Sequence, residues 1–267
     1  MKIKYPIKLI LLFFVISSCN FKKSNVVYNS YQGDKTLAFY LTFNGESEDK
    51  SSSNYKKKTG ETLFEKDRFG NENSAAIFSE KSFISYGDIL DSVFAGEKRR
   101  FTFSFWIKPL KNDKNVFLIA KNSDSNCNEG ERQFGVKFTS EERVQFLWLY
   151  NNEKYNGWRM FESVNKLKLN KWQSIIITYD GFSNGGDGAF RTNLYVNGKH
   201  EKFKSINKRG RLGFIEDKKA HFSIGTMVSS LGEVCSTNFF SGSLDDLMVF
   251  ERVLTGNEIE HISSLKK

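Results

Sequence analysis

Residues 148–159 (WLYNNEKYNGWR) hold the densest mixture of aromatic rings and hydrogen-bonding side chains in the sequence. Such a mixture binds sugars, because rings pack against the apolar side of a ligand while polar groups bond its hydroxyls. Trp148 lies in an alternating run and is predicted to be buried. The predicted ligand-binding residues are Tyr155, Trp158, Asn151, Asn152 and Arg159. The alternative is that the rings of Tyr155 and Trp158 cover the end of the core.

Paired carboxylates would be the signature of a glycoside hydrolase, which holds two of them about 5 to 10 Å apart across a cleft. Asp245 and Asp246 are the only adjacent acidic pair within a predicted strand. Neighbouring side chains on a strand point to opposite faces unless a bulge intervenes. His200, His221 and His261 are far apart in sequence, with no nucleophile signature beside them. We therefore predict no catalytic residues, with a glycan-active enzyme as the alternative.

The N-terminal residues have the pattern of an export signal. Lys2, Lys4 and Lys8 precede an apolar run at residues 9–16 that ends in Ser17-Ser18-Cys19. This run is far shorter than the ~20 apolar residues of a membrane-spanning helix, so we expect it to be removed. Residues 16–19 (ISSC) resemble the lipobox of bacterial lipoproteins, which implies acylation of Cys19 and a stable membrane anchor. An ordinary signal peptide with a chance cysteine is the alternative.

These features divide the chain into a signal peptide at 1–18, a lipidated N-terminus and polar tether at 19–35, and one domain at 36–267. The expected location is the bacterial cell envelope, in the outer membrane or at the cell surface. Cys127 and Cys235 remain in the exported domain, both in predicted loops. An oxidising compartment favours a disulfide between them, and two free thiols are the alternative.

Short alternating runs dominate the domain. In residues 101–108 (FTFSFWIK), period-two alternation places Phe101, Phe103, Phe105 and Ile107 on one core-facing side of a strand. Similar runs follow at residues 116–120, 134–138, 144–150, 174–179, 192–196, 222–226 and 244–250. Asn197-Gly198 is a strong hairpin-turn signal, and Thr255 with Glu258 forms a potential capping box for one helix at 255–265. This pattern predicts an all-β, two-sheet antiparallel sandwich or jelly roll with one short C-terminal helix.

Five segments, in this order, resemble the laminin-G-like, or concanavalin A-like, jelly-roll superfamily: LAFYLTFNG at 37–45, AAIF at 75–78 with FISY at 83–86, FTFSFWIKP at 101–109, WQSIIITYDG at 172–181 with LYVNGK at 194–199, and FSGSLDDLMVFERVLT at 240–255. The resemblance runs from about Leu37 to Ile262. It implies two antiparallel sheets and, in some members, ligand binding by loops or by the concave sheet. Function stays open, because the superfamily includes lectins, adhesion modules, pentraxin-like proteins and glycosidases.

The same resemblance implies a structural calcium ion, which many members hold. Residues 44–49 (NGESED) resemble the family's Asp-rich turn after the first strand, and Asp49 with Asp245 are the predicted metal ligands. Family members often continue with Ser-Gly-Asn-Gly, whereas this chain has Lys-Ser-Ser-Ser-Asn at 50–54. A solvated acidic loop is the alternative.

The net charge of +9 falls to +6 once the three lysines of the predicted signal peptide are removed, and this modest excess suits an anionic membrane or a glycan as well as a nucleic acid. No nucleic-acid motif surrounds the basic runs at 56–58 and 204–211, so we expect no nucleic-acid partner. The interpretation is an envelope-anchored lipoprotein with a non-catalytic domain that binds carbohydrate or a glycosylated partner. The alternatives are a glycan-active enzyme, which a carboxylate pair in a cleft would indicate, and a protein-protein adhesion module, which a flat apolar patch would indicate.

Overall fold

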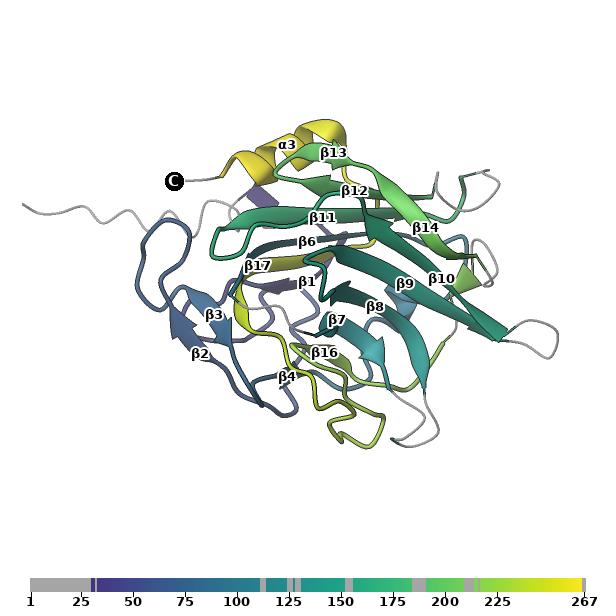
Figure 1. Cartoon of the computed structure of the whole chain (residues 1–267), viewed down its shortest axis with the longest axis horizontal. Coiled ribbons are helices and arrows are strands. Elements are labelled where there is room, and N and C mark those ends of the chain that lie inside the picture. The colour runs from purple at the N-terminus through teal and green to yellow at the C-terminus, as the bar shows by residue number, and fades with distance from the viewer. Residues whose placement is uncertain are drawn as a thin grey trace, which may run out of the picture.

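The computed structural model describes residues 30–31, 33–110, 114–123, 127, 131–151, 156–183, 191–208, 214–215 and 217–265 (Figure 1). The predicted signal peptide, Cys19 and most of the predicted tether lie outside these residues. In the described part of the chain, no helix combines the length and the apolar character that crossing a membrane requires.

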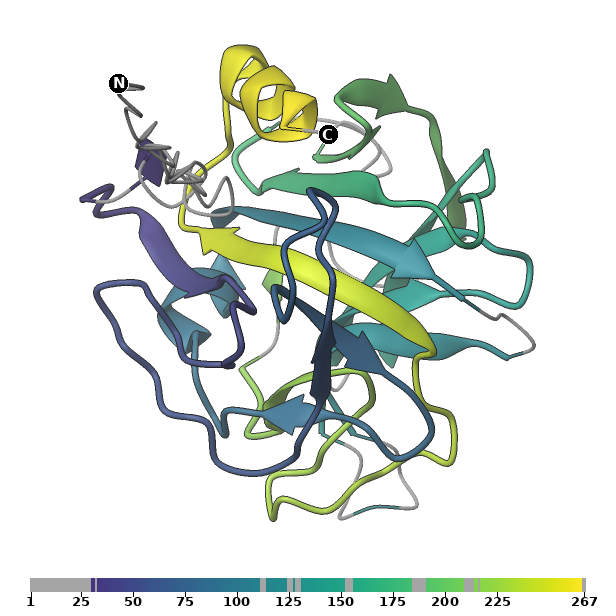
Figure 2. The ribbon, with the colours of Figure 1, turned by 90° about the vertical axis from the view of Figure 1, so that its left-hand side faces the viewer.

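Two large antiparallel sheets make up the fold, as the sequence predicts. The first sheet has the order β13 (Lys199–Glu201), β12 (Thr192–Val196), β11 (Gln173–Asp180), β6 (Arg100–Pro109), β17 (Gly242–Phe250), β3 (Ala75–Phe78) and β2 (Leu63–Glu65), with β1 (Leu37–Leu41) also paired to β17. The second sheet has the order β14 (Phe203–Lys208), β10 (Asn156–Ser163), β9 (Val144–Asn151), β8 (Arg132–Phe138), β7 (Val116–Asn122), β16 (Phe222–Ile224) and β4 (Ile84–Ser85). A small sheet pairs β15 (Phe214–Ile215) with β5 (Gly96–Glu97), beside the short helix α2 (Asp91–Phe94). Figure 2 shows β17, in yellow, running through the first sheet between β6 and the shorter strands β1 and β3.

The main core lies between the two large sheets. Phe101, Phe103, Phe105 and Ile107 are fully buried in it, which confirms the prediction for β6. From the second sheet, alternate residues of β9, Phe146 and Trp148 among them, pack against the same core. Trp148 is fully buried, as predicted. Alternation with period two gives each sheet one apolar face, and burying the two faces against each other fixes the sandwich.

The helix α3 (Gly256–Ser264) covers part of the first sheet's outer face (Figure 1). Its Ile259 and Ile262 pack with Ile176, Met248 and Phe250 in a second apolar cluster. The predicted capping box is present: the Thr255 hydroxyl accepts a hydrogen bond from the Glu258 amide, and the Glu258 carboxylate accepts one from the Thr255 amide. The other local prediction is also confirmed, because Asn197 and Gly198 join β12 to β13 with φ values of 53° and 76°.

Candidate ligand-binding site

An apolar patch lies on the face of the second sheet that points away from the core. Phe117 and Ala120 of β7 and Leu147 of β9 are buried there, and Trp158, Met160 and Met227 pack against them half-buried. The strand register explains the grouping, since Met160 is paired with Leu147 across β10 and β9. Figure 1 shows β7, β8, β9 and β10 lying side by side, so these residues come from neighbouring strands.

Gly135 of β8 makes room for one of the rings in this patch. A Cβ atom at this position would lie 2.3 Å from the ring of Phe117, a separation that real side chains do not tolerate. The absence of a side chain at Gly135 therefore lets the Phe117 ring lie against the sheet, where it forms part of a surface rather than filling the interior.

A hollow of about 240 Å³ opens over this patch, and we call it the aromatic hollow. Its lining combines the rings of Phe117 and Trp158 with the polar side chains of Asn122, Ser123, Arg132 and Lys137. The Arg132 guanidinium lies 5.6 Å from the Trp158 ring centre, and the Lys137 ammonium lies 4.4 Å from the Phe117 ring centre. Cations at such distances are attracted to the ring faces and hold the rings in place.

Asn122 gives the aromatic hollow a hydrogen-bonding group. The residue is 3% exposed, and its buried side-chain oxygen has no hydrogen-bond partner in the described part of the chain. A buried carbonyl oxygen without a partner costs free energy. The polar residues of the lining, together with the two rings, allow the hollow to hold a small ligand that has both an apolar side and polar groups.

Of the five predicted ligand-binding residues, the structure places one, Trp158, in this hollow. Arg159 follows it on β10, half-buried and paired in register with the core residue Trp148. Asn151 ends β9 with a side chain that is not described, and Asn152 and Tyr155 lie outside the described residues.

The sequence did not point to four other residues of the hollow: Phe117, Asn122, Arg132 and Lys137. They lie on β7 and β8 or at their ends, and only the order of strands in the folded sheet brings them near β10. The alternation in residues 132–138 was the available signal, since it places Lys137 on the face opposite Phe134 and Val136.

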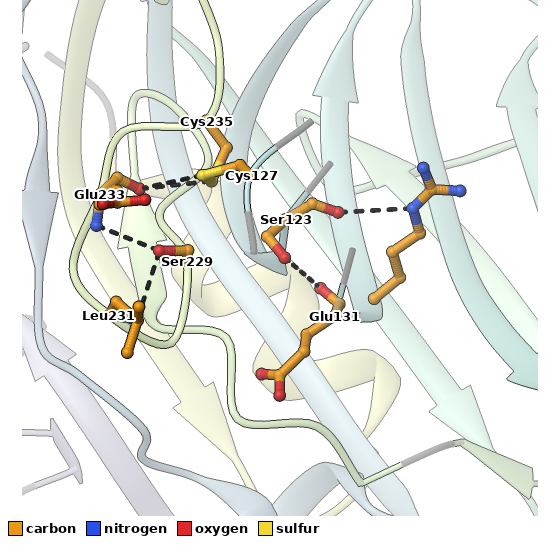
Figure 3. Close-up of a disulfide and its surroundings, with 8 residues drawn as sticks. Ser123, Cys127, Glu131, Ser229, Leu231, Glu233 and Cys235 are labelled. Carbon is orange, nitrogen blue, oxygen red and sulfur yellow. Dashed lines mark hydrogen bonds between the residues drawn. A yellow bond between two sulfur atoms is a disulfide. The ribbon is translucent and has the colours of Figure 1, made fainter. Parts of the chain in front are cut away.

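A disulfide joins Cys127 to Cys235, which confirms the predicted bridge. The two Cα atoms are 5.5 Å apart and the residues are 108 positions apart in sequence. Figure 3 shows the bridge between the turn that carries Ser229, Leu231 and Glu233 and the end of the second sheet at Ser123 and Glu131. The Cys235 amide donates a hydrogen bond of 3.0 Å to the Met227 carbonyl oxygen, and Val228 forms an antiparallel β-bridge with Val234. The disulfide therefore ties residues 227–235 to the end of the second sheet, beside the aromatic hollow.

Reduction of this disulfide is expected to lower the free energy of unfolding by about 4 to 5 kcal/mol in the chain-entropy model, because the bridge closes a long loop. Denaturant titrations with and without dithiothreitol measure the difference. Alkylation without reductant, followed by mass spectrometry, should leave both cysteines unmodified in the native protein. Two alkylated cysteines in that experiment would contradict the bridge.

Asp49 is held by the backbone around it. One carboxylate oxygen accepts hydrogen bonds from the amides of Tyr40 and Ser51, and the other from the Ser51 hydroxyl and the Tyr55 amide, all at 2.9 Å. Calcium would have to displace these four donors. Asp49 is buried, and its hydrogen bonds instead stabilise the turn that follows β1.

Asp245 lies in a different cluster, on the outer side of β17. A register irregularity between Asp245 and Met248, with φ of 46° at Asp246, turns both neighbouring carboxylates towards Arg68. Arg68 donates hydrogen bonds to Asp245 and, at 2.6 Å, to Asp246, and its guanidinium lies 4.7 Å from the Trp106 ring centre. The Tyr40 hydroxyl donates to the other oxygen of Asp246 at 2.6 Å.

This cluster is buried and charged. The side chains of Arg68, Asp245 and Asp246 are 2 to 4% exposed. Burial and the neighbouring Asp246 raise the pKa of Asp245 well above its ordinary value, while Arg68 acts in the opposite direction. Of the two predicted metal ligands, Asp49 accepts hydrogen bonds from Tyr40, Ser51 and Tyr55, whereas Asp245 pairs with Arg68, so the two carboxylates serve different clusters. Among the described residues, no group of three His, Cys, Asp or Glu side chains is placed to hold a metal ion. The donors present do not fit calcium.

One histidine has a hydroxyl beside it that the sequence did not reveal. Nδ1 of His221 lies 2.9 Å from the hydroxyl oxygen of Ser85. Ser85 is fully buried in β4, and burial lowers the pKa of His221. The carboxylate of Asp88, which acts on His221 through its charge, is bonded to the buried Lys121. A substrate cannot reach the Ser85 hydroxyl, so this pair is structural.

A family model described as the concanavalin A-like lectin/glucanases superfamily, of the laminin G type, matches residues 85–260. The chain belongs to this superfamily. Its two antiparallel sheets and the jelly-roll arrangement agree with membership. The description covers both lectins and glucanases, so membership alone does not choose between binding and hydrolysis. No curated protein sequence matches the chain.

A similar fold recurs in solved structures of binding domains. The binding domain of botulinum neurotoxin serotype G matches with a TM-score of 0.59 at 18% identity, over 86% of this chain and 51% of that one. The binding domain of Paraclostridial mosquitocidal protein 1 matches with a TM-score of 0.59 at 18% identity, over 85% and 52%. The botulinum neurotoxin D ligand-binding domain, solved in complex with N-acetylneuraminic acid, matches with a TM-score of 0.57 at 15% identity, over 86% and 50%. This chain spans about half the length of each, and the likeness is one of fold.

Proposed function

We propose that this protein is a non-catalytic binding module that takes a glycan in the aromatic hollow on the outer face of the second sheet. The observation that carries the proposal is that one hollow is lined by two aromatic rings, Trp158 and Phe117, and by the polar side chains of Asn122, Ser123, Arg132 and Lys137. A sugar offers a face of C–H groups to a ring and hydroxyl groups to polar side chains, so both parts of the lining suit it.

Two further observations support binding over hydrolysis. No aspartate or glutamate is among the described residues that line the aromatic hollow, whereas a glycosidase needs two carboxylates in its cleft. The similar solved structures named above are binding domains, one of them in complex with N-acetylneuraminic acid. A similar domain of botulinum neurotoxin DC was solved in complex with rat synaptotagmin II, so a protein is the second candidate partner.

Trp158→Ala is expected to weaken glycan binding about thirtyfold or more, because truncating an aromatic anchor at the centre of a site costs at least ~2 kcal/mol. A glycan array followed by calorimetry on the best sugar measures the effect. Trp172→Ala is the matched control, because Trp172 is also half-buried and has a cation, Lys108, 5.4 Å from its ring centre, yet lies outside the hollow. Equal losses of affinity in the two variants would contradict the proposed site.

We also propose that acylation of Cys19 anchors the protein in the cell envelope, which rests on the sequence ISSC at residues 16–19 and the polar stretch after it. In Cys19→Ala, an unprocessed or soluble species is expected in place of the species that partitions into the detergent phase. Detergent-phase partitioning of cell extracts measures this, with Cys127→Ala as a control for loss of a different cysteine. A Cys19→Ala protein that still partitions fully with lipid would contradict lipidation.

A further inference from the structure

A second hollow, of about 650 Å³, lies beside the disulfide, and we call it the loop hollow. Its lining contains the Cys127–Cys235 bridge and the residues that follow Glu233 up to Asn238. Met227 lines both this hollow and the aromatic hollow, so the two adjoin at that side chain.

The aromatic hollow by itself is small for a complete ligand. Its volume of about 240 Å³ falls below the roughly 300 to 1,000 Å³ of typical small-molecule sites. The loop hollow is well within that range. A ligand of usual size that enters the aromatic hollow would therefore extend beyond it, and the loop hollow adjoins it at Met227.

The loop hollow has the chemistry to receive such an extension. Ser236, Thr237 and Asn238 offer hydroxyl and amide groups, and Thr237 is exposed. The segment is also held in one shape: the Ser236 hydroxyl accepts a 3.0 Å hydrogen bond from the Asn238 amide, and the Asn238 side chain donates one of 3.4 Å to the Asn115 carbonyl oxygen. A surface fixed in this way by a disulfide and hydrogen bonds loses little entropy when a ligand binds.

Met227 is suited to the junction between the hollows. Its side chain is half-buried against the apolar patch, and its backbone is fixed by the Cys235 amide. The unbranched thioether side chain of methionine can change its conformation to fit a ligand that lies across it. The ligand can therefore pass over Met227 without a change in the backbone.

We propose that the loop hollow is a second subsite, and that the ligand is an oligosaccharide chain of at least two units rather than a single sugar. One unit lies against Trp158 and Phe117, and the chain then crosses Met227 to place its next units on residues 233–238. This inference rests on the proposed glycan-binding function. It assigns to the disulfide the role of holding the second subsite beside the first.

Calorimetry with two series of one to six units, N-acetylneuraminic acid oligomers and N-acetylglucosamine oligomers, tests the inference on the full-length protein. Affinity should rise at least tenfold from one unit to the chain in the series that binds. Thr237→Trp, which places a bulky ring among the residues that line the loop hollow, should abolish this rise and leave the affinity for the single sugar unchanged. Ser52→Trp, at an exposed position in the turn after β1, is the matched control and should keep the rise.

The possible failures are distinguishable. A single sugar that binds as tightly as its oligomers, or a rise that survives Thr237→Trp, would overturn the second subsite and leave the proposed function intact. A melting temperature of Thr237→Trp equal to that of Ser52→Trp shows that the variant is folded. Absence of binding by both series would overturn the proposed function and the second subsite together.

Discussion

Arg68→Met is expected to lower the free energy of unfolding by about 3 to 5 kcal/mol, the cost of removing one partner from a buried ion pair. The change leaves Asp245 and Asp246 side by side without a cation, with side chains 3 to 4% exposed. Methionine keeps most of the volume between Trp106 and Phe69, so the effect reports the charge rather than a cavity. Urea titration at neutral pH measures it.

The loss in Arg68→Met should depend on pH. Without Arg68, the pKa of Asp245 is raised further above the ~3.9 of the unfolded chain, by burial and by Asp246. A carboxyl group with a raised pKa in the folded state contributes stability below the unfolded pKa and loses it as the pH rises through the folded pKa. The variant should therefore approach the wild type in stability as the pH falls towards 4, and lie furthest below it at neutral pH.

The matched control for this cluster removes the charges together. Adding Asp245→Asn and Asp246→Asn to Arg68→Met should restore most of the lost stability at neutral pH, because neutral amides cost less to bury than unpaired carboxylates. A deficit that is the same from pH 4 to pH 7, or that the added substitutions do not reduce, would show that Arg68 acts through packing alone.

Phe103→Ala is expected to cost about 3 to 5 kcal/mol through the cavity that it leaves in the main core. The Phe103 ring is fully buried and packs on Phe94, with ring centres 5.2 Å apart, and on Phe134, at 5.4 Å. Thermal and denaturant unfolding measure the loss. Phe103→Leu, which keeps more of the volume, should cost clearly less.

The comparison with the ligand site makes this prediction sharper. Trp158 lies half-buried on the opposite face of the second sheet and packs only at the edge of a small cluster. Trp158→Ala should therefore melt close to the wild type while losing glycan binding, whereas Phe103→Ala melts early and binds normally while folded. An equally early melt of the two variants would place Trp158 in the core and remove it from the site.

The features that the sequence by itself determined are local ones. Alternation in residues 101–107 identified a core strand because the side chains of a strand alternate between faces wherever its partners lie. The cap at Thr255 and the turn at Asn197-Gly198 could also be read from the sequence, since each depends on residues within a few positions of one another. The resemblance of five segments to the superfamily pattern then implied two antiparallel sheets packed as a sandwich.

The candidate site was decided by the tertiary structure. Phe117 lies on β7 and Trp158 on β10, and two strands, β8 and β9, separate them in the sheet. Met227, from a turn far along the chain, lines the same hollow. The bulge that turns Asp245 and Asp246 towards Arg68 overrides the alternation that predicts opposite faces for neighbours. Residues distant in sequence form a site only through sheet order, register and loop packing, and these minimise the free energy of the whole chain rather than of any one segment.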